Sequence, residues 1–222
     1  MAQYKVVEIF ESINGEGRRV GQLALFIRFQ KCNLDCSYCD TKWANGDDAD
    51  YVLMTEDEIY DKVLESRMKN ITITGGEPLL QKDIYILLEK LSTNKNVNIE
   101  IETNGSISLE TFSMIENAPS FTMDYKLPAS NMENLMKIEN FSYLKAKDTV
   151  KFVASSIKDL EKAKEIIEKY SLIDKCAVYF SPVYGKIDLQ DMVEFMKVYN
   201  LNGVTLQLQI HKIIWDPNAK GV

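Results

Sequence analysis

Short apolar runs alternate with charged segments of helical period along most of this chain. Strands are predicted at 4–10, 23–29, 70–74, 97–102, 120–125, 149–154, 176–181 and 204–208. Helices are predicted near 55–68, 81–92, 109–116, 157–170 and 189–199. Thr55, with Glu58 three positions later, has the pattern of a helix N-cap. Repeated strand-helix units predict an α/β fold with a parallel sheet and right-handed crossovers.

About six such units are present, which is too few for a closed eight-stranded barrel. We therefore expect a partial (βα)6 barrel, TIM-like in its layout, forming a single domain over residues 1–222 with a short N-terminal strand extension. A doubly wound open sheet is the alternative, although the glycine pairs do not form a G-x-G-x-x-G fingerprint. In a barrel, residues that directly follow strands gather at one face. These are Cys32 to Thr41, Gly75 to Pro78, Thr103 to Gly105, Lys126 and His211.

Composition narrows the function classes. With 222 residues, 45% of them hydrophobic and 27% charged, the chain fits one globular core. No run approaches the roughly 18 apolar residues of a membrane helix, so we expect a soluble, cytoplasmic protein with no membrane partner. The formal charge of −7 argues against a general nucleic-acid-binding surface and favours a small-molecule substrate.

Three of the four cysteines lie within eight residues, as Cys32, Cys36 and Cys39 in a C-x3-C-x2-C pattern. Three thiolates on one loop can ligate three irons of a [4Fe-4S] cluster, whereas fully protein-ligated clusters use four cysteines. The fourth iron then keeps an open position for a small ligand. The spacing resembles the signature of radical S-adenosylmethionine (SAM) enzymes, in which SAM occupies that iron.

Other uses of these cysteines are less consistent with the sequence. A disulfide framework does not suit an intracellular chain of this size. A zinc site needs a fourth ligand, for which Asp35, Asp40, Cys176 and His211 are the candidates. An electron carrier with a fully ligated cluster would need Cys176, but that residue lies in an apolar run that predicts a buried strand.

Several motifs occur in an order that extends the resemblance. They are E-I-F-E-S-I-N-G-E-G near the N-terminus, C-x3-C-x2-C-D-T, Gly75-Gly76-Glu77-Pro78, E-T-N-G at 102–105, D-Y-K-L-P, and Q-L-Q-I-H-K near the C-terminus. Glycines allow backbone to approach a ligand closely, although each turn motif alone could be structural. From about residue 7 onward, the chain resembles the 7-carboxy-7-deazaguanine synthase family of radical SAM enzymes.

The resemblance implies a lyase that converts 6-carboxy-5,6,7,8-tetrahydropterin to 7-carboxy-7-deazaguanine with loss of ammonia, on the route to queuosine and other 7-deazapurines. It implies three cofactors: a [4Fe-4S] cluster, SAM and Mg2+. It also implies flavodoxin or ferredoxin as the reductant, and a homodimer. The alternatives are a glycyl-radical-enzyme activase, which shares the cysteine spacing, and a non-catalytic iron-sulfur electron carrier.

The resemblance also assigns roles by position. The cluster would be held by Cys32, Cys36 and Cys39, and Mg2+ by Thr41, since a hydroxyl oxygen suits this hard cation. Substrate would be bound by Ile13, Asn14, Gly15, Glu16, Arg28, Thr74 and His211. SAM would be bound by Tyr38, Cys39, Asp40, Gly76, Glu77, Thr103, Asn104, Asp124, Tyr125 and Lys126.

Three of these assignments have specific reasons or competitors. The Arg28 guanidinium can bind a carboxylate with two hydrogen bonds, although a solvent-facing charge is the alternative. His211, the only histidine, is predicted to lie in an apolar strand, either contacting substrate or hydrogen-bonded within the fold. Asn14 stands where the family usually has Gln, and its side chain is one methylene shorter.

Overall fold

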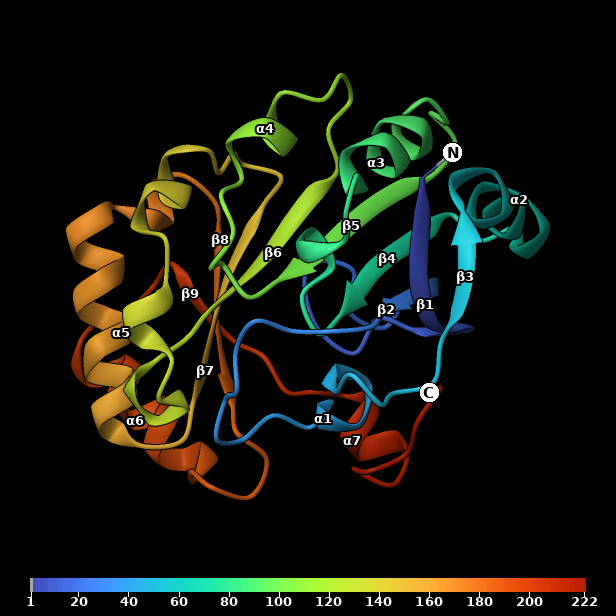
Figure 1. Cartoon of the computed structure of the whole chain (residues 1–222). Coiled ribbons are helices and arrows are strands. Elements are labelled where there is room, and N and C mark those ends of the chain that lie inside the picture. Colours follow the sequence, from blue (N-terminus) through green and yellow to red (C-terminus); the bar gives the residue numbers. More distant parts are fainter. Residues whose placement is uncertain (1) are drawn as a thin grey trace.

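The computed structural model describes residues 2–222, within which nine strands form one sheet (Figure 1). Their order across the sheet is β3-β1-β2-β4-β5-β6-β7-β8-β9. The strands are β1 (Gln3–Ile13), β2 (Leu23–Phe29), β3 (Val52–Thr55), β4 (Asn70–Gly75), β5 (Asn98–Thr103), β6 (Ser120–Tyr125), β7 (Thr149–Ala154), β8 (Ala177–Pro182) and β9 (Val204–Leu206). The sheet stays open, with β3 and β9 as its edges.

The strands from β2 onward in the sheet order pair in parallel, whereas β1 is antiparallel to both β2 and β3. The crossovers between parallel neighbours bring successive strands side by side in chain order. This arrangement confirms the predicted partial (βα)6 barrel. It excludes the doubly wound alternative, in which the strand order reverses at a switch point.

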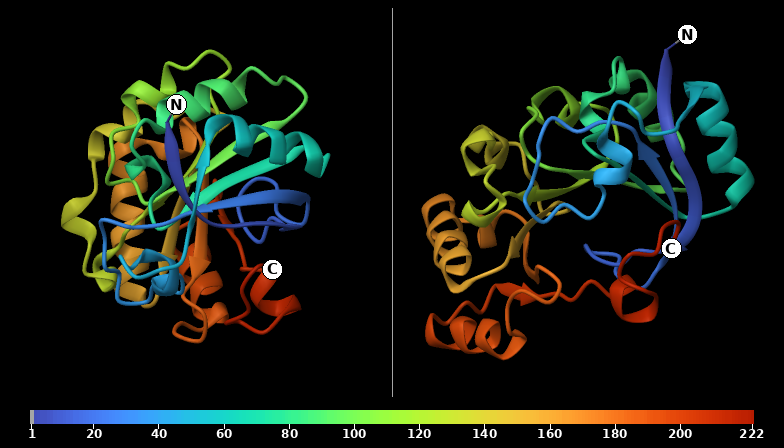
Figure 2. Two further views of the ribbon diagram at one scale, coloured as in Figure 1. Left: turned by 45° about the vertical axis from the view of Figure 1, so that its right-hand side comes forward. Right: turned by 60° about the horizontal axis from the view of Figure 1, so that its bottom comes forward.

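Helices cover the outer face of the curved sheet (Figure 2). They are α2 (Glu56–Ser66), α3 (Ile84–Ser92), α4 (Glu110–Ser113), α5 (Ile157–Tyr170) and α6 (Leu189–Val198), whereas the short helices α1 (Lys42–Asn45) and α7 (His211–Ile214) lie at the carboxyl ends of the strands. A continuous apolar core lies between helices and sheet, with Ile73, Leu87 and Phe152 fully buried. Among residues 2–222, no helix combines the length and apolar character needed to cross a bilayer.

The predicted cap of α2 is confirmed. The Thr55 side chain accepts a hydrogen bond from the backbone N–H of Glu58, and the Glu58 carboxylate accepts one from the backbone N–H of Thr55. This capping box pairs two backbone donors that the first helical turn leaves free. Since β3 ends at Thr55 and α2 begins at Glu56, the capping box also fixes the direction in which α2 leaves the edge strand β3.

The sequence missed or misplaced a few elements. Edge strand β3 was not predicted, because Val52 and Leu53 are exposed and gain their partners only through pairing with the distant β1. The predicted strand over 204–208 ends at Leu206. The prediction that His211 lies in an apolar strand was wrong, since His211 begins the short helix α7.

Candidate active site

A cavity opens at the carboxyl ends of the parallel strands, where the sequence predicted the functional residues to gather. Its walls come from the cysteine loop after β2, from the ends of β4, β5, β6 and β7, from the loop after β1, and from residues 209–222. Residues from both ends of the chain and from the centre of the sheet therefore line this cavity, and Figure 2 shows the C-terminal segment beside the end of β1.

The cysteine loop supplies three thiols to one side of the cavity, Cys32, Cys36 and Cys39. Nitrogen donors face two of the sulfurs. Cys32 Sγ accepts from the Leu34 backbone N–H (3.4 Å) and from Asn104 Nδ2 (3.6 Å), and Cys39 Sγ accepts from Asn45 Nδ2 (3.5 Å). Donors of this kind stabilise negative charge on sulfur and tune the potential of cluster-bound thiolates.

These thiols fit a cluster better than a single metal ion. In the described part of the chain, no three His, Cys, Asp or Glu side chains converge on one point as ligands of a metal ion. A cubane cluster has no such need, because each thiolate binds a different iron. Cys176 lies apart, buried in the apolar core and donating to the Leu172 carbonyl at 3.6 Å, so the loop offers three thiols and no fourth.

Gly75 and Gly76 allow the end of β4 to pack against the start of the cysteine loop. Gly75 has a φ of 152°, and a Cβ at this position would overlap the backbone of Phe29. At Gly76, a Cβ would overlap the Lys31 carbonyl, whose oxygen accepts from the Glu77 N–H at 2.9 Å. The glycine pair thus fixes the cysteine loop next to β4, in addition to lining the cavity.

Glu77 lies behind the cavity wall and joins two of its loops. Its side chain is fully buried and accepts from Leu79 N–H (3.0 Å), Asn104 N–H (2.6 Å) and the Thr103 hydroxyl (3.0 Å). Burial raises the pKa of Glu77 to about 7, against the lowering effect of these donors. Glu77 therefore connects the turn after β4 to the turn after β5. Asn104, held by Glu77 through its backbone N–H, donates with its side chain to Cys32 Sγ.

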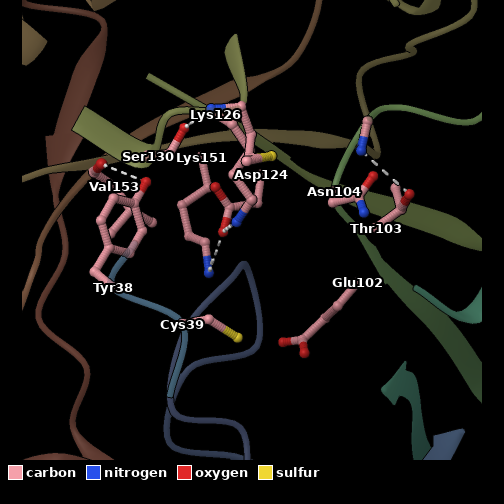
Figure 3. Close-up of polar contacts among 12 residues, drawn as sticks. Tyr38, Cys39, Glu102, Thr103, Asn104, Asp124, Lys126, Ser130, Lys151 and Val153 are labelled. Carbon is pink, nitrogen blue, oxygen red and sulfur yellow. Dashed lines mark hydrogen bonds and ion pairs between the residues drawn. The ribbon is translucent and has the colours of Figure 1, made fainter. Parts of the chain in front are cut away.

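A group of charged residues lies between the cysteine loop and the far wall (Figure 3). Asp124 Oδ2 is 2.9 Å from Lys126 Nζ and 3.8 Å from Lys151 Nζ. Tyr38 extends from the cysteine loop toward this group, and its hydroxyl donates to the Val153 carbonyl at 3.4 Å. The carboxylate and ammonium groups can therefore bind a ligand that itself carries both charges, such as an amino acid.

Arg28 lines the opposite side of the cavity on β2. Its Nε donates to Glu8 Oε1 at 2.7 Å, and its guanidinium carbon lies 5.9 Å from the Phe10 ring and 5.8 Å from the Trp43 ring. No other hydrogen bond of the Arg28 side chain occurs among residues 2–222. The terminal nitrogens are thus held in place by Glu8 and two rings while remaining able to bind a carboxylate.

The loop after β1 is fastened to the segment that follows β9. Gly17 N–H donates to Gln207 Oε1 at 2.7 Å, and Gln207 Nε2 donates back to the Gly17 carbonyl at 2.9 Å. Further along, Ile210 N–H donates to the Gly15 carbonyl at 3.1 Å. We call these contacts between residues 15–17 and 207–210 the terminal clip, and it closes the open side of the barrel beside the cavity.

His211 continues directly from the terminal clip. A Cβ at Gly15 would overlap the His211 imidazole, so only glycine allows this close approach. Burial lowers the pKa of His211, although the nearby Glu16 carboxylate opposes the shift. A neutral imidazole at the cavity wall can both donate and accept a hydrogen bond.

Three comparisons place the chain among known proteins. A family model described as the radical SAM superfamily matches residues 26–198. The chain is 60% identical over 219 residues to the 7-carboxy-7-deazaguanine synthase of Clostridium acetobutylicum, covering 99% of each chain. It is 37% identical over 213 residues to the protein of the same name from Methanospirillum hungatei, covering 96% of this chain and 86% of the relative.

The chain belongs to the 7-carboxy-7-deazaguanine synthase family of the radical SAM superfamily. The crystal structure of QueE from Escherichia coli shares its fold, with a TM-score of 0.74 at 19% identity over 93% of each chain. The resemblance inferred from the motifs is thereby confirmed, as is the class of enzyme.

Most residues that the family pattern singled out line the same cavity. They are Ile13, Gly15, Glu16, Arg28, Cys32, Cys36, Tyr38, Cys39, Asp40, Thr41, Thr74, Gly76, Thr103, Asn104, Asp124, Lys126 and His211. Glu77 lies behind the wall, and Tyr125 packs in the core against Phe141 and Phe152. Tyr125 and Lys126 are neighbours on a strand end, where successive side chains point to opposite faces.

Asn14 also stays outside the cavity lining of this family member. Its Oδ1 accepts from the Thr72 hydroxyl at 2.8 Å, and its side chain is 4% exposed. The Asn14 side chain thus ends against β4 and does not line the cavity, so the predicted substrate contact of Asn14 stays a prediction.

Sequence reasoning gave no individual role to several other cavity residues: Glu8, Glu102 and Gln209, which lie within the motifs noted above, and Trp43 and Lys151, which lie outside them. Glu102 accepts from the Thr74 hydroxyl at 2.8 Å, and Lys151 Nζ lies 3.0 Å from Glu16 Oε2. For Lys151, one signal in the sequence could have revealed it, because it is the only charged residue in the otherwise largely apolar and fully buried strand β7.

Proposed function

We propose that this protein is a radical SAM lyase that converts 6-carboxy-5,6,7,8-tetrahydropterin to 7-carboxy-7-deazaguanine with release of ammonia. The observation that carries the proposal is the single cavity in which a three-thiol loop faces a guanidinium with free donors. The 60% identity to a relative named for this product supports it.

The cysteine loop would hold a [4Fe-4S] cluster through Cys32, Cys36 and Cys39, leaving one iron for SAM. When bound, the cluster and SAM supply the radical that abstracts hydrogen from the substrate. On the protein side, Asp124 and Lys126 offer opposite charges to the amino and carboxylate groups of SAM. Other SAM contacts would come from Tyr38, Asp40, Gly76, Thr103 and Asn104, which line the same cavity.

Arg28 would bind the pterin carboxylate with its terminal nitrogens, since Glu8 already occupies Nε. Glu16, Ile13, Gly15, Thr74 and His211 form the rest of the substrate wall. Glu16 is suited to the hydrogen-bond donors of the pterin edge. Burial alone would raise the pKa of Glu16, but the Lys151 charge and the hydrogen bond from Gln209 outweigh that effect, and the net pKa is lowered. An ionised carboxylate accepts hydrogen bonds and cannot donate them.

Thr41 would bind Mg2+ beside the substrate. Its hydroxyl now donates to Asp40 Oδ1 at 3.0 Å, and Asp40 Oδ2 accepts from Lys212 Nζ at 2.7 Å. Rotation of this one hydroxyl would release its oxygen to a cation, and hard cations of this size take oxygen ligands together with water and substrate.

The remaining partners follow from the same proposal. Flavodoxin or ferredoxin would deliver the electron, the product would enter queuosine or another 7-deazapurine, and the enzyme would act as a homodimer in the cytoplasm. The formal charge of −7 is consistent with a small-molecule substrate in place of nucleic acid.

Anaerobic turnover tests the proposal. The cluster-reconstituted protein is incubated with SAM, dithionite, Mg2+ and 6-carboxy-5,6,7,8-tetrahydropterin, and products are separated by chromatography. We expect 7-carboxy-7-deazaguanine, ammonia and no net loss of SAM. Cleavage of SAM to 5′-deoxyadenosine without any deazaguanine would point to the activase alternative, and absence of both would point to an electron carrier.

A further inference from the structure

Lys151 has no role in the reaction as described so far, yet it lies at the centre of the buried charges. It extends from β7 into the cavity with a side chain that is 10% exposed, 3.0 Å from Glu16 Oε2 and 3.8 Å from Asp124 Oδ2. Figure 3 shows Lys151 beside Asp124 and above the cysteine loop. One ammonium group therefore joins the loop after β1 to the end of β6.

The neighbouring carboxylates keep Lys151 charged. Burial by itself lowers the pKa of Lys151, but Glu16, Asp124 and Glu102 outweigh that effect and the net pKa is raised. Removing one member of a buried ion pair leaves its partner uncompensated at a substantial cost in free energy. Glu16 and Asp124 are thus held in their positions by the same cation.

Each of these two carboxylates also keeps one oxygen free. Glu16 Oε2 accepts from Lys151 and from Gln209, and Asp124 Oδ2 accepts from Lys126. Glu16 Oε1 and Asp124 Oδ1 are buried and have no hydrogen-bond partner among residues 2–222. Buried polar atoms are almost always paired, so these two oxygens point to ligands that donate hydrogen bonds.

We propose that Lys151 is a positioning residue that couples binding of the pterin to binding of SAM. The inference rests on the proposed function, in which Glu16 faces the pterin and Asp124 faces SAM. A ligand that donates to Glu16 Oε1 fixes Glu16, and through Lys151 it also fixes Asp124. Binding of the first ligand therefore already incurs the conformational-entropy cost of ordering Glu16, Lys151 and Asp124, and the second ligand binds more tightly because it does not incur that cost again. By linkage, the effect is the same in either order.

Equilibrium binding to the cluster-loaded protein tests the coupling without turnover. With the cluster oxidised and no reductant present, the Kd of SAM is measured with and without saturating 6-carboxy-5,6,7,8-tetrahydropterin. We expect the pterin to lower this Kd about tenfold in the native protein, within the usual range of coupling. In Lys151→Met, the ratio of the two Kd values should fall to about twofold or less, and Lys151→Arg should retain most of it.

The controls separate coupling from damage to the fold. Lys158→Met removes the same charge from the exposed side of α5 and should keep the native ratio, and iron content should be equal in all variants. If Lys151→Met does not fold, Glu16→Gln tests the same link and should lose the coupling as well. The proposal is overturned if a cluster-loaded Lys151→Met or Glu16→Gln protein keeps the native ratio, or if the native protein shows none. Failure of the proposed function would be recognised separately, because the native protein would then not bind the pterin at all.

Discussion

The Gln207 side-chain amide pairs with the backbone of Gly17 in both directions, accepting from its N–H at 2.7 Å and donating to its carbonyl at 2.9 Å. The two residues are 190 positions apart, and both of these hydrogen bonds are buried. This pair holds the loop that carries Gly15 and Glu16 against the segment that carries Gln209 and His211.

Replacing Gln207 by methionine should therefore weaken substrate binding. The Gly17 N–H and carbonyl would lose their partners, which costs about 1–3 kcal/mol per buried group. We expect a lower unfolding temperature and a KM for the pterin raised about tenfold, with a smaller change for SAM. Gln190→Met, on the exposed side of α6, serves as the control. It should change neither the KM for the pterin nor the KM for SAM.

Arg28→Lys tests the recognition of a carboxylate. Lysine keeps the charge but loses the planar pair of donors, and hydrogen bonds to charged groups contribute about 1.5–3 kcal/mol. The KM for the pterin should rise about 10- to 100-fold, while the Kd of SAM and the iron content stay unchanged. An equal loss of SAM binding would contradict the assignment of Arg28 to substrate, and Arg67→Lys at the exposed end of α2 is the matched control.

Cys176→Ala should leave the cluster intact. Cys176 packs in the core, where its thiol donates to the Leu172 carbonyl and also meets the backbone of Val150, so its loss should cost about 1 kcal/mol of stability. Iron and sulfide content should match the native protein after reconstitution, whereas Cys36→Ala should lose the cluster. A Cys176→Ala protein without a cluster would show that four thiols are needed.

Glu77→Gln should destabilise the two turns that flank the cavity. An amide nitrogen would face a backbone donor in place of a carboxylate oxygen, leaving an N–H of Leu79 or Asn104 unpaired at a cost of about 1–3 kcal/mol. The unfolding temperature should fall at pH 8 by several degrees. We expect this fall in the cluster-free protein, to which no SAM is bound. An unchanged unfolding temperature of cluster-free Glu77→Gln would instead indicate that Glu77 acts only as a direct SAM ligand.

His211 provides a direct test of the electrostatics, because it is the only histidine in the chain. Burial is the main reason that the pKa of His211 lies below the usual 6.5 of a histidine. The neutral form is therefore favoured by folding, and its stabilising contribution is present above pH 6.5 and lost as the pH falls through the lowered pKa. The imidazole proton signals of the cluster-free protein should titrate below those of the unfolded chain, and a higher midpoint in the folded protein would contradict the burial seen here.

Periodicity and motif spacing were enough to predict the barrel and the position of the site. The cysteine loop, Gly76, Asn104 and Lys126 each follow directly after a strand, and parallel strands bring such positions together. Edge strand β3 and helix α7 were beyond this reasoning, because both depend on contacts with the N-terminal hairpin that leave no local pattern.

The same limit applies within the site. Glu77 resembles a ligand in its motif, but whether a buried carboxylate faces a cavity or a backbone turn depends on strand packing. Lys151 carries no motif at all, and its importance arises from carboxylates 135 residues before it and 27 residues before it, at Glu16 and Asp124. Sequence spacing does not reveal such long-range charge pairing.

The terminal clip also sets an order of events during synthesis. Residue 17 leaves the ribosome long before residue 207, and contacts of such large sequence separation form late and slowly in folding. The cysteine loop, β4 and β5 can come together while the chain is still growing, but the wall that carries Glu16 and His211 cannot. If the residues act as proposed, the half of the pocket that would hold the cluster is available before the half that would recognise the substrate, and the metal centre could be assembled in a chain that cannot yet bind pterin.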